Sequence, residues 1–228
     1  MSALALLAFA SALFVGTHFA MSHPLRAGLV AKLGDRGFLG AYSLISVVTL
    51  GAMVHFYHGA KAAAPDPLWS SGNVGWWAAT LLMWLGSILF VGSLRRNPAF
   101  PTAGKPVTQI GPARGVFAIT RHPMMWSFAI WALVHAMINP IMAALVTSTA
   151  IAILALGGAA GQDAKKEKLI GEPWRDWEAR TSFIPFGRGF AMPDAFALIG
   201  GTLLWLAATW AHGALGYLRA GVFHFIAT

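Results

Sequence analysis

The stretch His122–Gln162, HPMMWSFAIWALVHAMINPIMAALVTSTAIAILALGGAAGQ, decides the fold of this chain. Its 41 residues contain no Asp, Glu, Lys or Arg, and Asn139-Pro140 is the only interruption. A helix crosses a bilayer with about 20 apolar residues, so this run is long enough for two crossings joined by a tight turn. We therefore predict a helical hairpin at residues 123–160 in an integral membrane protein.

Four further stretches without charged side chains extend the membrane prediction: 1–25, 37–60, 67–94 and 195–218. In lipid each backbone amide must be paired within its own segment, so each stretch is expected to form one spanning helix. Only 11% of the residues are charged and 57% are hydrophobic, whereas roughly a quarter are charged in soluble domains. The predicted fold class is all-α, a polytopic transmembrane helical bundle of about six spans. We treat residues 1–228 as a single transmembrane domain.

The basic residues predict how the bundle is oriented. Of 16 Lys and Arg, all but Lys61 and Arg219 lie between the first and second, third and fourth, or fifth and sixth predicted spans. Basic loops stay on the cytoplasmic side, so both termini are expected to face outward. Topology and contact with anionic lipid then explain the net charge of +8. No basic run alternates with aromatic residues, which favours the lipid bilayer and not nucleic acid as a partner.

The connections between the predicted spans differ in character. Residues 95–120 are rich in Pro and Gly, which predicts an irregular lid or platform at the cytoplasmic face. Residues 163–168, DAKKEK, are expected to continue the fifth helix into water, with Asp163 and Glu167 solvated. Pro123 fits the first turn of the fourth helix, where its missing amide costs nothing.

The chain contains no cysteine. This excludes disulfides, thiolate-ligated haem, iron–sulfur clusters and Cys-based zinc sites. Any metal must therefore be held by His, Met or carboxylate side chains.

Seven short motifs resemble the NnrU family of membrane proteins. They are Thr17-His18, Leu25-Arg26, Gly37-Phe38, Tyr42-Ser43-Leu44, Ile119-Thr120-Arg121-His122-Pro123, Trp131-Ala132-Leu133-Val134-His135 and Arg180-Thr181-Ser182-Phe183-Ile184-Pro185-Phe186. The family includes the plant 15-cis-zeta-carotene isomerase, a haem b protein of plastid membranes, and bacterial members associated with nitrogen-oxide metabolism. The resemblance implies a bacterial inner-membrane protein that binds one haem b.

The resemblance also implies an activity and two metal ligands. A related enzyme would be a haem-dependent cis–trans isomerase whose substrate, an apolar polyene such as zeta-carotene, enters from lipid between the spans. The isomerase holds its haem between two histidines, which fall on His18 and His135 here. The cysteine of its second motif is Ala132 in this chain, so a redox switch that uses this thiol is absent. No catalytic residue is assigned.

Helix geometry puts the two implied ligands at different depths. With a rise of about 1.5 Å per residue, His18 lies near the cytoplasmic end of its helix and His135 lies about 18 Å from that face. Axial ligands share one depth. Either the hairpin does not span the membrane fully, or the fourth helix starts outside the apolar core, or the haem ligands are not the pair His18 and His135. By depth alone, His122 matches His18. Three histidines match His135, namely His55, His58 and His212.

His122 has two interpretations of its own. As a residue at the start of a helix, it is expected to hydrogen-bond to loop backbone. Together with Arg121 it could instead contact an anionic group such as a haem propionate.

Two other function classes remain open. An Arg-His-Pro, an Asn-Pro turn, Gly171-x-x-Trp174-x-x-Trp177 and a closing Ile-Pro also resemble the isoprenylcysteine carboxyl methyltransferase superfamily, which binds S-adenosylmethionine there. Its paired Glu residues fall on Gln162 and Asp163, and its paired Tyr residues are Trp here, so we expect the methyl-donor site to be lost. The third hypothesis is a non-catalytic accessory that carries haem or stabilises a respiratory or nitric-oxide-handling complex.

Overall fold

The computed structural model describes residues 1–63, 66–100 and 107–226. Over these residues it is helical and contains no strand, which confirms the predicted all-α class. The helices are α1 (Ala3–Ser22), α2 (Arg26–Ala62), α3 (Gly72–Ser93), α4 (Val116–Ile119), α5 (Pro123–Ile138), α6 (Met142–Ile170), α7 (Glu172–Arg180), α8 (Ala195–Ala214) and α9 (Val222–Ile226).

Five of these helices, α1, α2, α3, α6 and α8, are long and apolar enough to cross a membrane. The helix predicted as the fourth span, α5, is apolar but has only 16 residues. At about 1.5 Å per residue it is about 24 Å long, shorter than the hydrocarbon core of about 30 Å. The hairpin is confirmed, because α5 and α6 are separated by a short turn at Asn139 and Pro140.

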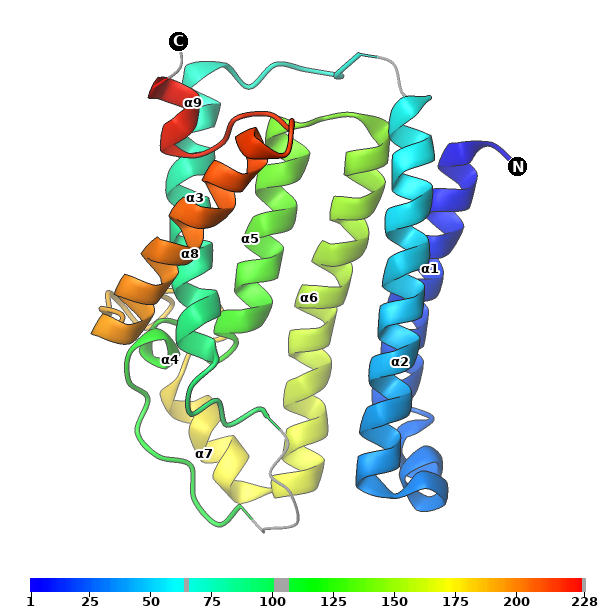
Figure 1. Cartoon of the computed structure of the whole chain (residues 1–228). Coiled ribbons are helices and arrows are strands. Elements are labelled where there is room, and N and C mark those ends of the chain that lie inside the picture. The colour runs from blue at the N-terminus through cyan, green and yellow to red at the C-terminus, as the bar shows by residue number, and fades with distance from the viewer. Residues whose placement is uncertain (64–65, 101–106, 227–228) are drawn as a thin grey trace.

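The long helices run alternately up and down, so their connections gather at two ends of the bundle (Figure 1). The end that carries the connections from α1 to α2, from α3 to α5 and from α6 to α8 is called the basic end. The opposite end, called the terminal end, carries both chain termini (Figure 1). The described parts of the three basic connections thus lie together, as the charge pattern predicts; Lys105 lies outside the described residues.

α6 joins two halves of the bundle. It packs against α1 and α2 on one side and against α5 on the other, while α3 packs against both α5 and α8 (Figure 1). Each half has its own buried apolar cluster. The first half is built around Leu7, Phe14, Met53 and Ile141, and the second around Leu89, Ile119, Ile130, Trp174 and Trp177.

Glycines allow close helix contacts in both halves. A Cβ atom on Gly201 of α8 would lie 2.5 Å from the Cα atom of Ile88 on α3. On α6, a Cβ atom on Gly157 would lie 2.9 Å from the Phe19 ring of α1. Small residues are what permit such approach between helices in a bilayer, where lipid tails are as apolar as the side chains.

The connections correct one prediction and confirm others. The basic segment after the first span is not a loop, because α2 already begins at Arg26 and is broken only at Gly34, whose φ is +69°. Residues 163–168 continue α6 as predicted, and Pro123 is the first residue of α5. Within the described part of the irregular connection after α3, the only helix is the four-residue α4.

We predict that Gly201→Ala loosens the contact between α3 and α8. The added methyl group would meet backbone atoms of Ile88, which cannot move aside as a flexible side chain would, and overpacking of this kind costs about 1–3 kcal/mol. Thermal unfolding in detergent measures the effect. Gly51→Ala on α2, where a Cβ atom meets nothing within 4 Å, is the control and should be neutral or slightly stabilising. Equal unfolding temperatures for both variants would contradict the close contact.

Candidate functional site

Arg121 and His122 meet Asp163 of α6 at the basic end. Two guanidinium nitrogens of Arg121, Nε and Nη2, donate to Asp163 Oδ2 at 2.9 and 2.7 Å. His122 Nε2 lies 2.9 Å from the other carboxylate oxygen, Oδ1. The His122 side chain has 0% exposed surface and that of Asp163 has 11%. Burial of a charge is costly unless it is paired, so Asp163 is the anion that compensates Arg121 and orients His122.

Asp163 was expected to be solvated at the end of its helix, and this expectation is wrong. Its neighbour Glu167 is exposed as expected. The physical reason is that the α5–α6 hairpin brings Arg121 back to the same level of α6, and the ion pair excludes water from the carboxylate. The anion beside Arg121 and His122 is therefore a residue of the chain itself.

Glu178 of α7 completes the charged cluster. Its Oε1 lies 3.7 Å from Arg121 Nη2. Burial, a hydrogen bond with Glu167 and the negative charge of Asp163 together raise the pKa of Glu178 to about 7. The Glu178 carboxyl is thus a group that exchanges a proton near neutral pH at the basic end.

Backbone pairing holds this cluster in place. The segment before α5 lies against the chain that follows α7: the Arg121 amide donates to Ser182 O at 2.8 Å, and Thr120 Oγ1 donates to Phe183 O at 2.7 Å. Trp126 Nε1 of α5 also donates to Phe183 O, at 2.8 Å. The segments around Thr120 and Ser182, about 60 residues apart in the chain, therefore form one structural unit.

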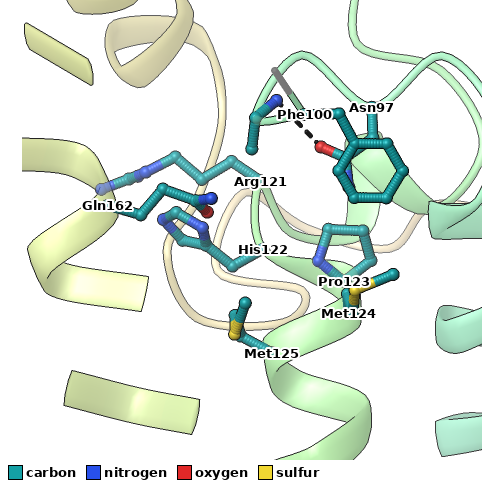
Figure 2. A pocket seen from close by; sticks show the side chains of 9 residues that line it. Asn97, Phe100, Arg121, His122, Pro123, Met124, Met125 and Gln162 are labelled. Atoms are coloured by element: carbon teal, nitrogen blue, oxygen red, sulfur yellow. Dashed lines mark hydrogen bonds between the residues drawn. The ribbon is translucent and has the colours of Figure 1, made fainter. Parts of the chain in front are cut away.

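A small cavity adjoins His122. Figure 2 shows Gln162 of α6 beside the His122 ring, with Asn97 and Phe100 on the other side. The cavity volume is about 20 Å³, which suits a single water molecule. His122 Nδ1 is buried and has no hydrogen-bond partner among residues 1–63, 66–100 and 107–226. This volume is far below the roughly 300 Å³ of an organic ligand site, and Asp163 is already paired with Arg121.

His135 lies near the terminal end, beside a second histidine. Its Nδ1 is 2.8 Å from Trp131 O on the same helix, and its ring stacks on Trp131 at a centroid distance of 3.9 Å. The ring of His212 on α8 lies 6.3 Å from that of His135. His212 repeats the local geometry, with Nδ1 2.9 Å from Ala208 O. In both histidines this bond occupies Nδ1, so Nε2 is the nitrogen left for a ligand.

The two basic residues of the terminal end contact neighbours of His212. The ring of Tyr217 lies 6.3 Å from that of His212, and Lys61 Nζ of α2 lies 5.3 Å from the Tyr217 ring centroid. Arg219 approaches Gly213, the residue after His212: a Cβ atom there would lie 3.5 Å from Arg219 Cγ. Lys61 and Arg219 are thus each linked to His212 through one intervening residue.

The structure does not bring His18 and His135 together. His18 lies at the basic end of α1, with Nδ1 2.7 Å from Phe14 O and its ring 5.3 Å from that of Tyr42. His135 lies at the opposite end of α5, and α6 lies between the two helices (Figure 1). The depth difference expected from helix rise is present. One haem with both residues as axial ligands does not fit this arrangement.

The other depth-matched histidines are placed differently from His212. His55 and His58 are both exposed on α2, and each has a ring contact only with its neighbour in the sequence among the described residues. The signal that could have singled out His212 is its place near the end of the last long helix, level with His135.

We predict that Glu178 makes stability depend on pH. Because its pKa is about 7 in the folded protein and near 4.5 in an exposed chain, folding is favoured by the protonated form. This contribution is present at low pH and is lost as the pH rises from about 4.5 to about 7. Over that range Glu178→Gln should lose fewer degrees of unfolding temperature than the unmodified protein. Glu172→Gln, at an exposed position on the same helix, should lose as many degrees as the unmodified protein. The same dependence of unfolding temperature on pH in all three proteins would refute the assignment.

Comparison with known proteins gives one match. The sequence model of the family described as "NnrU protein" matches residues 6–220. No curated protein and no solved structure matches the chain. The match spans the bundle from the first helix to the segment after α8 and includes the motifs at both ends. The chain belongs to the NnrU family.

Proposed function

We propose that this protein binds one haem b near the terminal end, with His135 and His212 as its axial ligands. The observation that carries the proposal is the pair of imidazole rings, contributed by two helices and lying 6.3 Å apart between centroids. Two histidines are the ligands expected of a six-coordinate haem b, and the chain has no cysteine to replace them.

The spacing of the two rings supports this assignment. An imidazole nitrogen lies about 2 Å from a bound transition metal, so nitrogens on opposite sides of one metal are about 4 Å apart. The ring centroids are then on the order of 6 Å apart. The carbonyls of Trp131 and Ala208 accept from Nδ1 in the two rings, which fixes the tautomer with Nε2 free.

The surrounding charges suit the acidic side chains of haem. Lys61 and Arg219 are the only basic residues of the chain outside the three basic segments, and each contacts a neighbour of His212. An ammonium and a guanidinium group would pair with the two propionates at the water boundary. Arg121 and His122, the other residues predicted to contact a propionate, are occupied by Asp163 at the opposite end.

The resemblance extends the proposal to the isomerisation of an apolar polyene such as zeta-carotene. Bound haem iron would supply a redox-active centre with a displaceable ligand. The chain would contribute an approach from lipid, because His135 and His212 are only partly buried and the apolar side chains of Leu133 and Trp210 beside them are exposed. The accessory role in nitrogen-oxide metabolism is the alternative, and it needs no substrate to enter.

We predict that removal of either ring of the pair abolishes haem binding. Purified His135→Ala and His212→Ala, supplied with haem, should lose the b-type absorbance spectrum of the unmodified protein in its oxidised and dithionite-reduced forms. His58→Ala is the matched control, since His58 is an exposed histidine toward the same end. Retention of the spectrum in His212→Ala, with its loss in His18→Ala and His135→Ala, would instead establish the pair implied by the family.

We predict that the reduced, haem-loaded protein converts a 15-cis polyene to its trans isomer, measured by chromatography of the extracted pigment. His58→Ala should retain the conversion and His212→Ala should lose it. If the loaded protein keeps its haem spectrum but leaves the pigment unchanged, the isomerase activity is wrong and the accessory role is favoured.

A further inference from the structure

A larger cavity, of about 370 Å³, lies at the basic end. Its walls come from the end of α3, the loop before α4, helix α7 and the start of α8. The polar side chains that line it are Arg95, Arg96, Arg114, Trp177 and Asp194. This volume falls in the range of organic ligand sites, roughly 300–1,000 Å³. The cavity shares no lining residue with the small one beside His122.

Four of the five polar side chains that line this cavity, the three arginines and Trp177, carry only hydrogen-bond donors. Among the described residues, none of the three arginines forms an ion pair, and Arg95 contacts only the Phe196 ring, 4.6 Å from its guanidinium carbon. Trp177 is 2% exposed, and within the described part of the chain its Nε1 has no acceptor. A buried donor without an acceptor costs free energy, so the cavity lacks a partner that could accept hydrogen bonds.

Three acceptors in the cavity wall are already used. The carboxylate of Asp194 caps α8, where its Oδ1 accepts from the Ala197 amide at 2.9 Å. The carbonyls of Ile110 and Gly111 accept from the guanidinium group of Arg180. A ligand that brings acceptor oxygens and negative charge would therefore complement the three arginines, which outnumber the single carboxylate of Asp194.

We propose that this cavity binds a phosphate group. A phosphate offers several acceptor oxygens and up to two negative charges, which match three guanidinium groups better than a single carboxylate would. The cavity lies where α3 ends and α8 begins, which is the depth of lipid head groups if the long helices span the bilayer. The side chains of Leu94, after α3, and Phe196, in the first turn of α8, are exposed at this end. The phosphate can come from an anionic phospholipid or from a soluble phosphate compound.

The test compares a double variant in the cavity with a single control variant outside it. Arg96→Gln with Arg114→Gln removes two cations from the cavity and leaves Arg95 on Phe196. Arg175→Gln changes an exposed arginine at the same end that does not line the cavity. The delipidated full-length proteins are titrated with short-chain phosphatidylglycerol, short-chain phosphatidylcholine and inorganic pyrophosphate, at low and high salt. Far-ultraviolet circular dichroism checks folding, and Arg114→Gln alone replaces the double variant if the latter does not fold.

The unmodified protein and Arg175→Gln should bind phosphatidylglycerol or pyrophosphate with equal affinity, and the double variant at least about tenfold more weakly. High salt should weaken the binding. Preference for phosphatidylglycerol over pyrophosphate identifies the lipid source, and the reverse identifies a soluble phosphate. Equal affinity in all proteins, equal binding of phosphatidylcholine and phosphatidylglycerol, or no binding of either anion overturns the proposal.

Discussion

The ion pair between Arg121 and Asp163 is the interaction on which the basic end depends. Both side chains are largely removed from water, where an unpaired charge would be prohibitive. The pair fixes the start of α5 against α6, and with it the buried ring of His122. The chain around Ser182 and Phe183 then docks on this fixed corner through backbone hydrogen bonds. The position of the irregular connections at this end therefore depends on the Arg121–Asp163 ion pair.

The two candidate sites are far apart because the bundle separates its polar groups. Lipid requires apolar side chains along the length of each helix, so charged and hydrogen-bonding groups collect at the two ends. The terminal end holds the paired imidazoles of His135 and His212, and the basic end holds the charged cluster and the arginine-lined cavity. Among the described helices, α6 makes the main contacts with both halves of the bundle, and it carries Asp163 at one end. The proposed haem and phosphate sites therefore do not compete for residues.

The sequence identified the charged residues and histidines of the candidate sites better than it identified the residues with which they pair. Arg121 and Asp163 bound the 41-residue uncharged run on either side. A hairpin must return its ends to one level, so their pairing could have been anticipated. The prediction failed because a helix end rich in Lys and Glu is ordinarily solvated. For His135, helix rise gave the correct depth, but depth alone left three possible partners. The choice between them depends on which helices lie side by side.

The sequence by itself determined the membrane class, the hairpin at Asn139-Pro140, the start of α5 at Pro123 and the common end of the basic connections. These features depend on local hydropathy, backbone chemistry and charge, which are properties of short segments. The tertiary structure decided that α6 separates α1 from α5, that α8 brings His212 to His135, and that three arginines surround one cavity. Such contacts depend on lateral helix packing, which glycines such as Gly201 permit. When helix surfaces are equally apolar, their hydropathy does not indicate which helices pack side by side.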